Sequence, residues 1–185
     1  MTPGRPFRNV ALIGFMGVGK STIGALVASL LDFTLVDTDK VIEERTGRRV
    51  AEIFASEGEA AFRALEAGLV QELESAQGKV IATGGGLPMF PGNFESLQRH
   101  AYVTCLWASV DTIYQRVRYQ SHRPLLHTAD PTARIRELLT ERSPIYRKAD
   151  LLVGVDFRAP AESARLIVSA YRQVTTVRPV FHAVS

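Results

Sequence analysis

Short apolar runs alternate along the chain with stretches of helical periodicity. The first run, residues 10–13, is continuous and stops at Gly14, which is typical of a strand buried on both faces of a parallel sheet. Apolar residues then recur every three or four positions from Ile23 to Leu31, the spacing of an amphipathic helix. This order of strand, glycine loop and helix predicts the start of a βαβ unit.

Four more apolar runs have the length of strands, and helical spacing separates them. These predicted strands cover residues 33–36, 80–82, 102–107 and 151–155. Strands that alternate with helices predict an α/β fold, here a three-layer α/β/α arrangement whose middle layer is a five-stranded parallel sheet. Ligands bind beyond the carboxyl ends of the strands in such sheets, so the turns after the first three strands should meet in one cleft.

The helices between these strands have recognisable limits. A long, mainly helical stretch runs from residue 40 to about residue 75, with interruptions expected at Thr46-Gly47 and Glu57-Gly58. Ser109 is a candidate N-cap, and Asp130-Pro131 combines an N-cap with proline in the first turn. The helix that starts there should kink or end near Ser143-Pro144.

The remaining segments are a loop, a last helix and a tail. Residues 119–130 show no period, and we interpret them as a mobile loop. Residues 174–185 show no pattern. A single domain over residues 1–185, with its core at about 8–173, is therefore expected. The last helix carries Ala164, Ile167, Val168 and Tyr171 on one face.

Composition limits the possible partners. The chain has 185 residues, 46% hydrophobic and 22% charged, with a formal net charge of +3, as in ordinary globular proteins. Arginine supplies 18 of the 22 basic residues, which favours an anionic ligand, although a bias in genomic base composition explains the excess equally well. The charges are scattered, so the sequence does not support a nucleic-acid partner.

The lone cysteine and the N-terminal residues bear on the cellular compartment of the protein. Cys105 cannot form an intrachain disulfide, and its apolar neighbours favour a core position over a nucleophile. A single cysteine fits a reducing compartment. Residues 1–9 lack an apolar stretch of signal-peptide length, and no run approaches a membrane span. We expect a cytoplasmic monomer without a membrane partner.

Residues 14–21 match the phosphate-binding pattern G-x-x-x-x-G-K-[ST] in full. Its glycines let backbone N–H groups surround phosphate oxygens, while Lys20 reaches the β- and γ-phosphates and Ser21 binds Mg²⁺. The competing interpretation, a flexible glycine turn, does not explain why the pattern lies between a strand and a helix. The guanine-binding pattern Asn-Lys-x-Asp is absent from the sequence, which favours ATP as the nucleotide.

Asp37 and Asp39 follow the second predicted strand. If the extended conformation persists, side chains two positions apart point to the same face. One carboxylate could then support Mg²⁺ beside Ser21, and the other could accept the proton of an acceptor hydroxyl. The alternative is that an aspartate caps the helix that starts at Lys40, and Asp39 could serve both purposes.

Other candidate residues are ambiguous by themselves. Gly84, Gly85 and Gly86 suggest that backbone approaches a small ligand closely, but a plain loop is an equal alternative. Arg123 lies in the predicted mobile loop, where a closing lid could bring it to the transferred phosphoryl group; a solvated surface arginine is the alternative. Arg63 and Arg142 lie beside apolar helix positions. Considered alone, each is interpreted as an amphipathic side chain at the edge of a helix.

Taken in order, these motifs resemble the shikimate kinase family, one of the nucleoside-monophosphate-kinase-like P-loop proteins. The resemblance covers about residues 8–173 and implies a lid at about 119–130 and a substrate-binding region at about 38–75. The motifs that carry it are Gly14-Phe15-Met16-Gly17-Val18-Gly19-Lys20-Ser21-Thr22, Asp37-Thr38-Asp39, Phe62-Arg63-x-x-Glu66, Thr83-Gly84-Gly85-Gly86, Arg123-Pro124-Leu125-Leu126 and Glu141-Arg142-x-Pro144-x-Tyr146.

The family's activity is implied for this chain as an expectation. It is the transfer of the γ-phosphate of ATP to the 3-hydroxyl of shikimate, a step in making chorismate and the aromatic amino acids. The resemblance assigns Asp39 to the acceptor hydroxyls and as a possible base, and Lys20 and Arg123 to catalysis. It assigns Ser21 and Asp37 to Mg²⁺.

The remaining binding roles follow from the same resemblance. It assigns the substrate carboxylate to Arg63 and Arg142, and the ring hydroxyls to the backbone of residues 84–86. It assigns ATP to Gly17, Val18, Gly19, Lys20, Ser21, Thr22, Arg116, Arg123 and Arg158, with the last of these in the adenine loop at residues 155–160.

Two competing functions remain open at this point. A gluconate kinase-like enzyme would share the phosphate loop, but the Asp-Thr-Asp, triple-glycine and Arg-Pro-Leu-Leu motifs argue against it. A catalytically dead nucleotide-binding regulator would be expected to lose the phosphate lysine or the acceptor aspartate, and Lys20 and Asp39 are both present.

Overall fold

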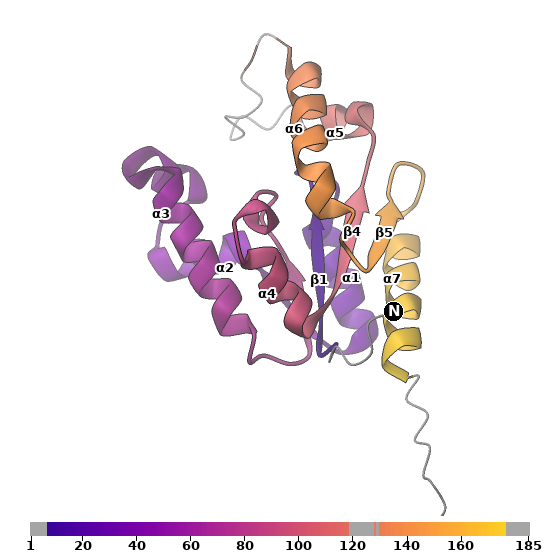
Figure 1. Cartoon of the computed structure of the whole chain (residues 1–185). Coiled ribbons are helices and arrows are strands. Elements are labelled where there is room, and N and C mark those ends of the chain that lie inside the picture. The colour runs from indigo at the N-terminus through magenta and orange to yellow at the C-terminus, as the bar shows by residue number, and fades with distance from the viewer. Residues whose placement is uncertain (1–6, 119–127, 129, 177–185) are drawn as a thin grey trace, which may run out of the picture.

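The computed structural model describes residues 7–118, 128 and 130–176. Five strands form one sheet in the order β2-β3-β1-β4-β5, and all neighbouring strands are parallel (Figure 1). This confirms the predicted parallel sheet. The strands are β1 Asn9–Gly14, β2 Thr34–Asp37, β3 Lys79–Ala82, β4 Ala101–Trp107 and β5 Leu151–Gly154.

Helices cover both faces of the sheet. Helices α1 and α7 pack against each other on one face, while α4 packs against β4 on the other, which gives the predicted three layers (Figure 1). No helix in the described part of the chain is both long and apolar enough for a membrane span. The helices are α1 Lys20–Leu31, α2 Thr38–Thr46, α3 Val50–Leu73, the short 3₁₀ helix η1 Leu87–Met89, α4 Asn93–His100, α5 Val110–Val117, α6 Pro131–Tyr146 and α7 Pro160–Thr176.

The strand order places a topological switch at the centre of the sheet. From β1 the chain moves to β2 and β3 on one side, and later to β4 and β5 on the other. Every residue of β1 is buried, which explains why its sequence is continuously apolar from Val10 to Ile13 instead of alternating. The loop after β1 therefore lies at the switch point, where ligands bind in open parallel sheets.

Most helix boundaries follow the predicted signals. The Ser109 hydroxyl accepts a hydrogen bond from the N–H of Thr112 at the start of α5, and Asp130 caps α6 in the same way. Helix α2 ends before Gly47, and α3 contains one non-helical residue, Gly58, with φ 81°. Positive φ values favour glycine, so both predicted interruptions are confirmed.

The strand-to-helix junction at Asp37 differs from the expectation. Helix α2 begins at Thr38, so the extended conformation does not persist to Asp39, and the same-face argument for the two aspartates was wrong. The N-cap is Asp37, whose carboxylate accepts from the N–H of Lys40, while Asp39 lies in the first helical turn. Capping competes successfully here because Asp side chains bind the first unpaired N–H groups of a helix.

The proline of α6 lies in the last turn of that helix. Helix α6 ends at Tyr146, two residues past Pro144, so the predicted end near Ser143-Pro144 is confirmed. The segment Leu87–Met89 and helix α4, Asn93–His100, were not predicted. Helix α4 is eight residues long, like α5, but it follows Gly92 and lacks the side-chain N-cap that marks the start of α5.

Candidate active site

The phosphate loop turns from β1 into α1 through two special glycines. Gly14 has φ 135°, and a side-chain carbon there would lie 2.3 Å from the carbonyl oxygen of Leu106. Gly19 has φ 96° and is the N-cap of α1. Side chains would be strained at both positions, so the loop depends on glycine at each end. The result is a tight turn that leads directly into the N-terminus of α1, and the free N–H groups at a helix N-terminus favour the binding of an anion.

Lys20 begins α1 and bends back over this loop. Its ammonium donates hydrogen bonds to the carbonyl oxygens of Gly14, at 2.9 Å, and Phe15, at 2.8 Å. The predicted ATP residues from Gly17 to Thr22 all lie in this turn and the first turn of α1. Loop amides, a lysine and a helix N-terminus together suit a polyphosphate.

Ser21 and Asp37 meet beside the phosphate loop. The Ser21 hydroxyl donates a 2.5 Å hydrogen bond to Asp37 Oδ2, which joins the first turn of α1 to the end of β2. Among the described residues, no group of three or more His, Cys, Asp or Glu could hold a metal by itself. Mg²⁺ needs no such group, since it keeps several waters and binds one or two protein oxygens plus substrate phosphates. This hydroxyl–carboxylate pair therefore fits Mg²⁺.

The segment after β3 packs tightly against acidic side chains. A side-chain carbon at Gly84 would lie 2.6 Å from Asp39 Oδ1 and 2.8 Å from Glu66 Oε1. The N–H of Gly84 donates to the Thr38 hydroxyl at 2.9 Å, which attaches this segment to the start of α2. Asp39 is thus held at the glycine segment, as the sequence interpretation expected.

The next two glycines have equally close neighbours. A side-chain carbon at Gly86 would lie 2.5 Å from Arg63 Nη2, and one at Gly85 would lie 3.4 Å from the backbone nitrogen of Met16 in the phosphate loop. Close approach, and not a positive φ, therefore explains the glycine run. It brings the segment against both the phosphate loop and the charged side chains of α2 and α3.

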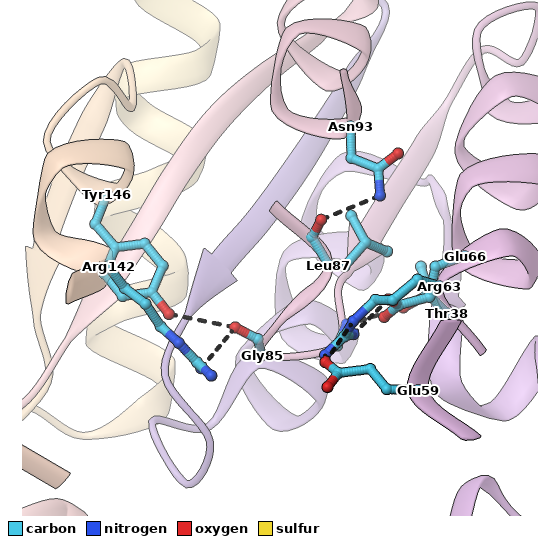
Figure 2. Close-up of polar contacts among 10 residues, drawn as sticks. Thr38, Glu59, Arg63, Glu66, Gly85, Leu87, Asn93, Arg142 and Tyr146 are labelled. Carbon is cyan, nitrogen blue, oxygen red and sulfur yellow. Dashed lines mark hydrogen bonds and ion pairs between the residues drawn. The ribbon is translucent and has the colours of Figure 1, made fainter. Parts of the chain in front are cut away.

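Arg63 reaches the glycine segment from α3. Its guanidinium donates to Glu59 at 2.9 Å and to Glu66 at 2.5 Å, both within one turn of the same helix (Figure 2). The rings of Phe54 and Phe62 flank it, with centroids 5.9 Å and 5.6 Å from the guanidinium carbon. These contacts restrict the arginine to one position beside Gly86.

Glu66 is a buried acid beside the glycine segment to which the sequence analysis assigned no role. Its side chain has no exposed surface, and burial raises the pKa of its carboxyl to about 7, against the opposing effect of Arg63. The Asp39 carboxylate adds to this increase in pKa. The position three residues after Arg63 on a helix was the available signal, since such pairs face each other.

Arg142 reaches the same segment from α6, on the opposite side from Arg63 (Figure 2). It donates to the Gly85 carbonyl at 3.1 Å, and its guanidinium carbon lies 5.2 Å from the centre of the Phe15 ring. Tyr146 donates its hydroxyl to the same carbonyl at 3.3 Å. Burial raises the pKa of Tyr146 to about 12, so its hydroxyl stays protonated. The structure thus brings both predicted arginines to one glycine segment.

The predicted adenine side is built around Arg116. This side chain donates to the carbonyl of Gly17 in the phosphate loop and to that of Val155 after β5. It therefore joins the two loops expected to enclose the base. Arg158 instead donates to the carbonyl of Gly154 in its own loop at 2.9 Å, so its contact is local.

Two further predictions concern Arg123 and Cys105. Arg123 lies outside the described residues, as does the expected lid at 119–130 apart from Thr128 and Asp130. Cys105 is buried, and burial raises the pKa of its thiol to about 12. A thiol that stays protonated is a poor nucleophile, so the core assignment of Cys105 is confirmed.

Comparisons with known proteins point in one direction. The chain matches a family model described as shikimate kinase over residues 16–172. A shikimate kinase from Thermodesulfovibrio yellowstonii is 40% identical over 168 residues, which cover 91% of this chain and 97% of that protein.

Solved structures agree with this match. A shikimate kinase from Acinetobacter baumannii, in complex with shikimate, has a TM-score of 0.87 and 34% identity, covering 94% of this chain and 97% of that one. A gluconokinase from Sinorhizobium meliloti has a TM-score of 0.58 and 15% identity, covering 93% of this chain and 96% of that one. The second likeness shows a shared fold alone.

Proposed function

Because this chain belongs to the shikimate kinase family, we propose that it transfers the γ-phosphoryl group of ATP to the 3-hydroxyl of shikimate. The products are shikimate 3-phosphate and ADP, in the route to the aromatic amino acids. The observation that carries the proposal is the position of residues 84–86. This segment packs against the phosphate loop, Asp39, Arg63 and Arg142, so a small acid bound on it would face the phosphate donor.

The phosphate loop forms the donor side. The amides of Gly17, Val18 and Gly19 and the positive end of α1 hold the phosphate oxygens, and Lys20 neutralises charge on the β- and γ-phosphates. Ser21 and Asp37 would hold Mg²⁺, which supplies Lewis-acid stabilisation of phosphate charge when bound. Thr22, in the first turn of α1, is the last ATP-binding residue of this donor side.

The acceptor side is built from Asp39, two arginines and the glycine backbone. Arg63 and Arg142 bind the substrate carboxylate from opposite sides of residues 84–86, because guanidinium groups pair well with carboxylates. The backbone of these glycines binds ring hydroxyls, with no side chain to keep the ligand at a distance. Asp39 orients the 3-hydroxyl.

The chemical step then needs only proton acceptance and charge stabilisation from the protein. Asp39 accepts the proton of the 3-hydroxyl while the oxygen of this hydroxyl bonds to the γ-phosphorus. The bond between the γ-phosphorus and the β–γ bridging oxygen breaks, and ADP leaves. Lys20 stabilises the charge that develops on the leaving ADP. Arg123 supplies positive charge from the lid, and Arg116 and Arg158 form the adenine side.

An assay of ADP release tests the proposal directly. The purified chain, with ATP and Mg²⁺, is offered shikimate, gluconate and nucleoside monophosphates in parallel. Turnover with shikimate alone is expected. Turnover with gluconate alone would overturn the assignment, and binding of both ATP and shikimate without turnover would indicate a regulator.

A further inference from the structure

We propose that Phe15, a residue of the phosphate loop, is a positioning residue for the acid-binding side of the site. Its ring supports Arg142, so the nucleotide loop sets the place of an arginine that binds the other substrate. The inference rests on the proposed function and extends it, because it joins the donor and acceptor halves of the site through one side chain.

The contact between Phe15 and Arg142 joins elements far apart in sequence. Phe15 follows β1 and is 1% exposed, and the guanidinium carbon of Arg142, on α6, lies over its ring at 5.2 Å from the centroid. The face of an aromatic ring attracts a cation within about 6 Å of its centre. This attraction holds the arginine against the phosphate loop.

A second contact fixes the arginine in another direction. Arg142 donates to the carbonyl of Gly85 at 3.1 Å. Gly85 itself packs against the backbone on both sides of Phe15, since a side-chain carbon there would lie 3.4 Å from Met16 N and 3.8 Å from Gly14 O. Ring, glycine carbonyl and loop backbone thus form one small unit around the guanidinium.

The same residue also contacts the phosphate lysine. The carbonyl oxygen of Phe15 accepts a hydrogen bond from Lys20 Nζ at 2.8 Å. Phe15 therefore touches a donor-side cation through its backbone and an acceptor-side cation through its ring. A phosphate that draws Lys20 toward itself changes the first contact, so nucleotide binding and acid binding should be coupled through this residue.

Ordinary core packing is the competing explanation for a buried phenylalanine. Phe94 on α4 provides the comparison, because it is also 1% exposed and belongs to the same core. If packing were the whole role of Phe15, Phe15→Leu and Phe94→Leu would have similar consequences. Only Phe15→Leu should act on the binding of the acid.

The first experiment measures the shikimate KM, the ATP KM and kcat for the wild type, Phe15→Leu and Phe94→Leu. Calorimetric titration with shikimate, with and without ADP, provides binding constants that do not depend on turnover. Phe15→Leu should weaken shikimate binding about 3- to 10-fold, the range of a partly buried cation–π contact. Its effect on the shikimate KM should exceed its effect on kcat and on the ATP KM, and it should reduce the effect of ADP on shikimate binding.

A double-mutant cycle separates positioning from packing. In an Arg142→Ala background, Phe15→Leu should cause no further loss of shikimate binding, because the cation it supports is gone. Phe15→Met, with a flexible chain of similar volume, is made in parallel in case the leucine variant does not fold.

Three results would overturn the inference. Unchanged shikimate binding in Phe15→Leu and Phe15→Met would remove the positioning role while leaving the proposed function intact. Equal losses in the presence and absence of Arg142 would reduce Phe15 to a packing residue. A wild-type chain that neither binds nor phosphorylates shikimate would overturn the proposed function and this inference together.

Discussion

Arg63 donates a 2.5 Å hydrogen bond to Glu66, a carboxyl group with no exposed surface. The pair lies behind the glycine segment, where Glu66 Oε1 and Asp39 Oδ1 would both collide with a side chain at Gly84. Burial of a carboxyl beside another acidic group is costly, and its partner arginine offsets part of that cost. The glycine segment therefore packs against a buried acid whose cost of burial Arg63 partly offsets.

This buried acid predicts a pH dependence of stability. The pKa of Glu66 is raised by burial from 4.5 to about 7 in the native state. Between pH 4.5 and pH 7 the native state keeps a proton on Glu66 that the unfolded chain releases. The stabilisation of the native state by this proton is therefore complete below pH 4.5 and is lost as the pH rises through 7. Glu66→Gln, which does not titrate, should therefore gain in melting temperature relative to wild type between about pH 5 and pH 8.

Glu72→Gln is the control for this prediction. Glu72 pairs with Arg45 on the exposed side of α3, and this partner lowers its pKa. Its carboxylate is ionised in both states across the same pH range, so the difference from wild type should stay constant. A constant difference for Glu66→Gln as well would show that Glu66 keeps an ordinary pKa.

Asp39→Asn tests the acceptor aspartate. An amide cannot accept the proton of the hydroxyl, so kcat should fall at least about 100-fold, the lower limit for a general base, while the ATP KM changes little. Steady-state kinetics with both substrates provide the measurement. Asp111→Asn is the control, because Asp111 also lies in a first helical turn but is solvent-exposed. Unchanged kcat in Asp39→Asn would refute the role.

Arg63→Ala and Arg142→Ala test the carboxylate contacts. Each removes a charge-assisted hydrogen bond worth about 1.5–3 kcal/mol, so the shikimate KM should rise about 10- to 100-fold. Arg172→Ala is the control, because Arg172 also donates to a backbone carbonyl, that of Leu30, on the surface of α7. Near-normal shikimate KM values in both site variants would exclude these arginines as the carboxylate site.

Substitutions in the glycine segment test the close approaches. Gly84→Ala should displace Asp39, and Gly86→Ala should displace Arg63, because each new methyl group would lie within 2.6 Å of that side chain. We expect kcat/KM for shikimate to fall at least about 10-fold, since small misplacements at a reacting centre are costly. Gly68→Ala in α3 meets nothing within 4 Å and should keep full activity. Full activity in Gly84→Ala would mean that the glycine segment accommodates a methyl group without displacing Asp39.

Asp37→Asn tests the metal residues. Asparagine caps helices as well as aspartate does, so α2 should remain folded while a charged oxygen ligand is lost. The Mg²⁺ concentration for half-maximal rate should rise at least about 10-fold, the loss typical even of outer-sphere changes. Asp156→Asn is the control, because Asp156 accepts a hydrogen bond from Ser109 in the same manner. Equal Mg²⁺ dependence in both variants would exclude Asp37 as a ligand.

Local signals in the sequence were sufficient for the sheet and the phosphate loop. The strand β1 and the turn from Gly14 to Ser21 are recognisable because burial on both faces and the geometry of a phosphate turn restrict consecutive residues. The caps at Ser109 and Asp130 are equally local. The start of α2 was misplaced because Asp37 and Asp39 are both good N-caps, and propensity cannot choose between them.

By itself the sequence determined the fold class, the order of the strands along the chain and the chemistry of the phosphate loop. Only the tertiary structure decided that Gly84 and Gly86 make room for Asp39 and Arg63, that Glu66 is buried behind them, and that Phe15 supports Arg142. The physical reason is that hydrophobic periodicity reports which residues are buried within one element. It cannot report which side chains from separate elements meet, because that depends on how the packed layers place those elements in space.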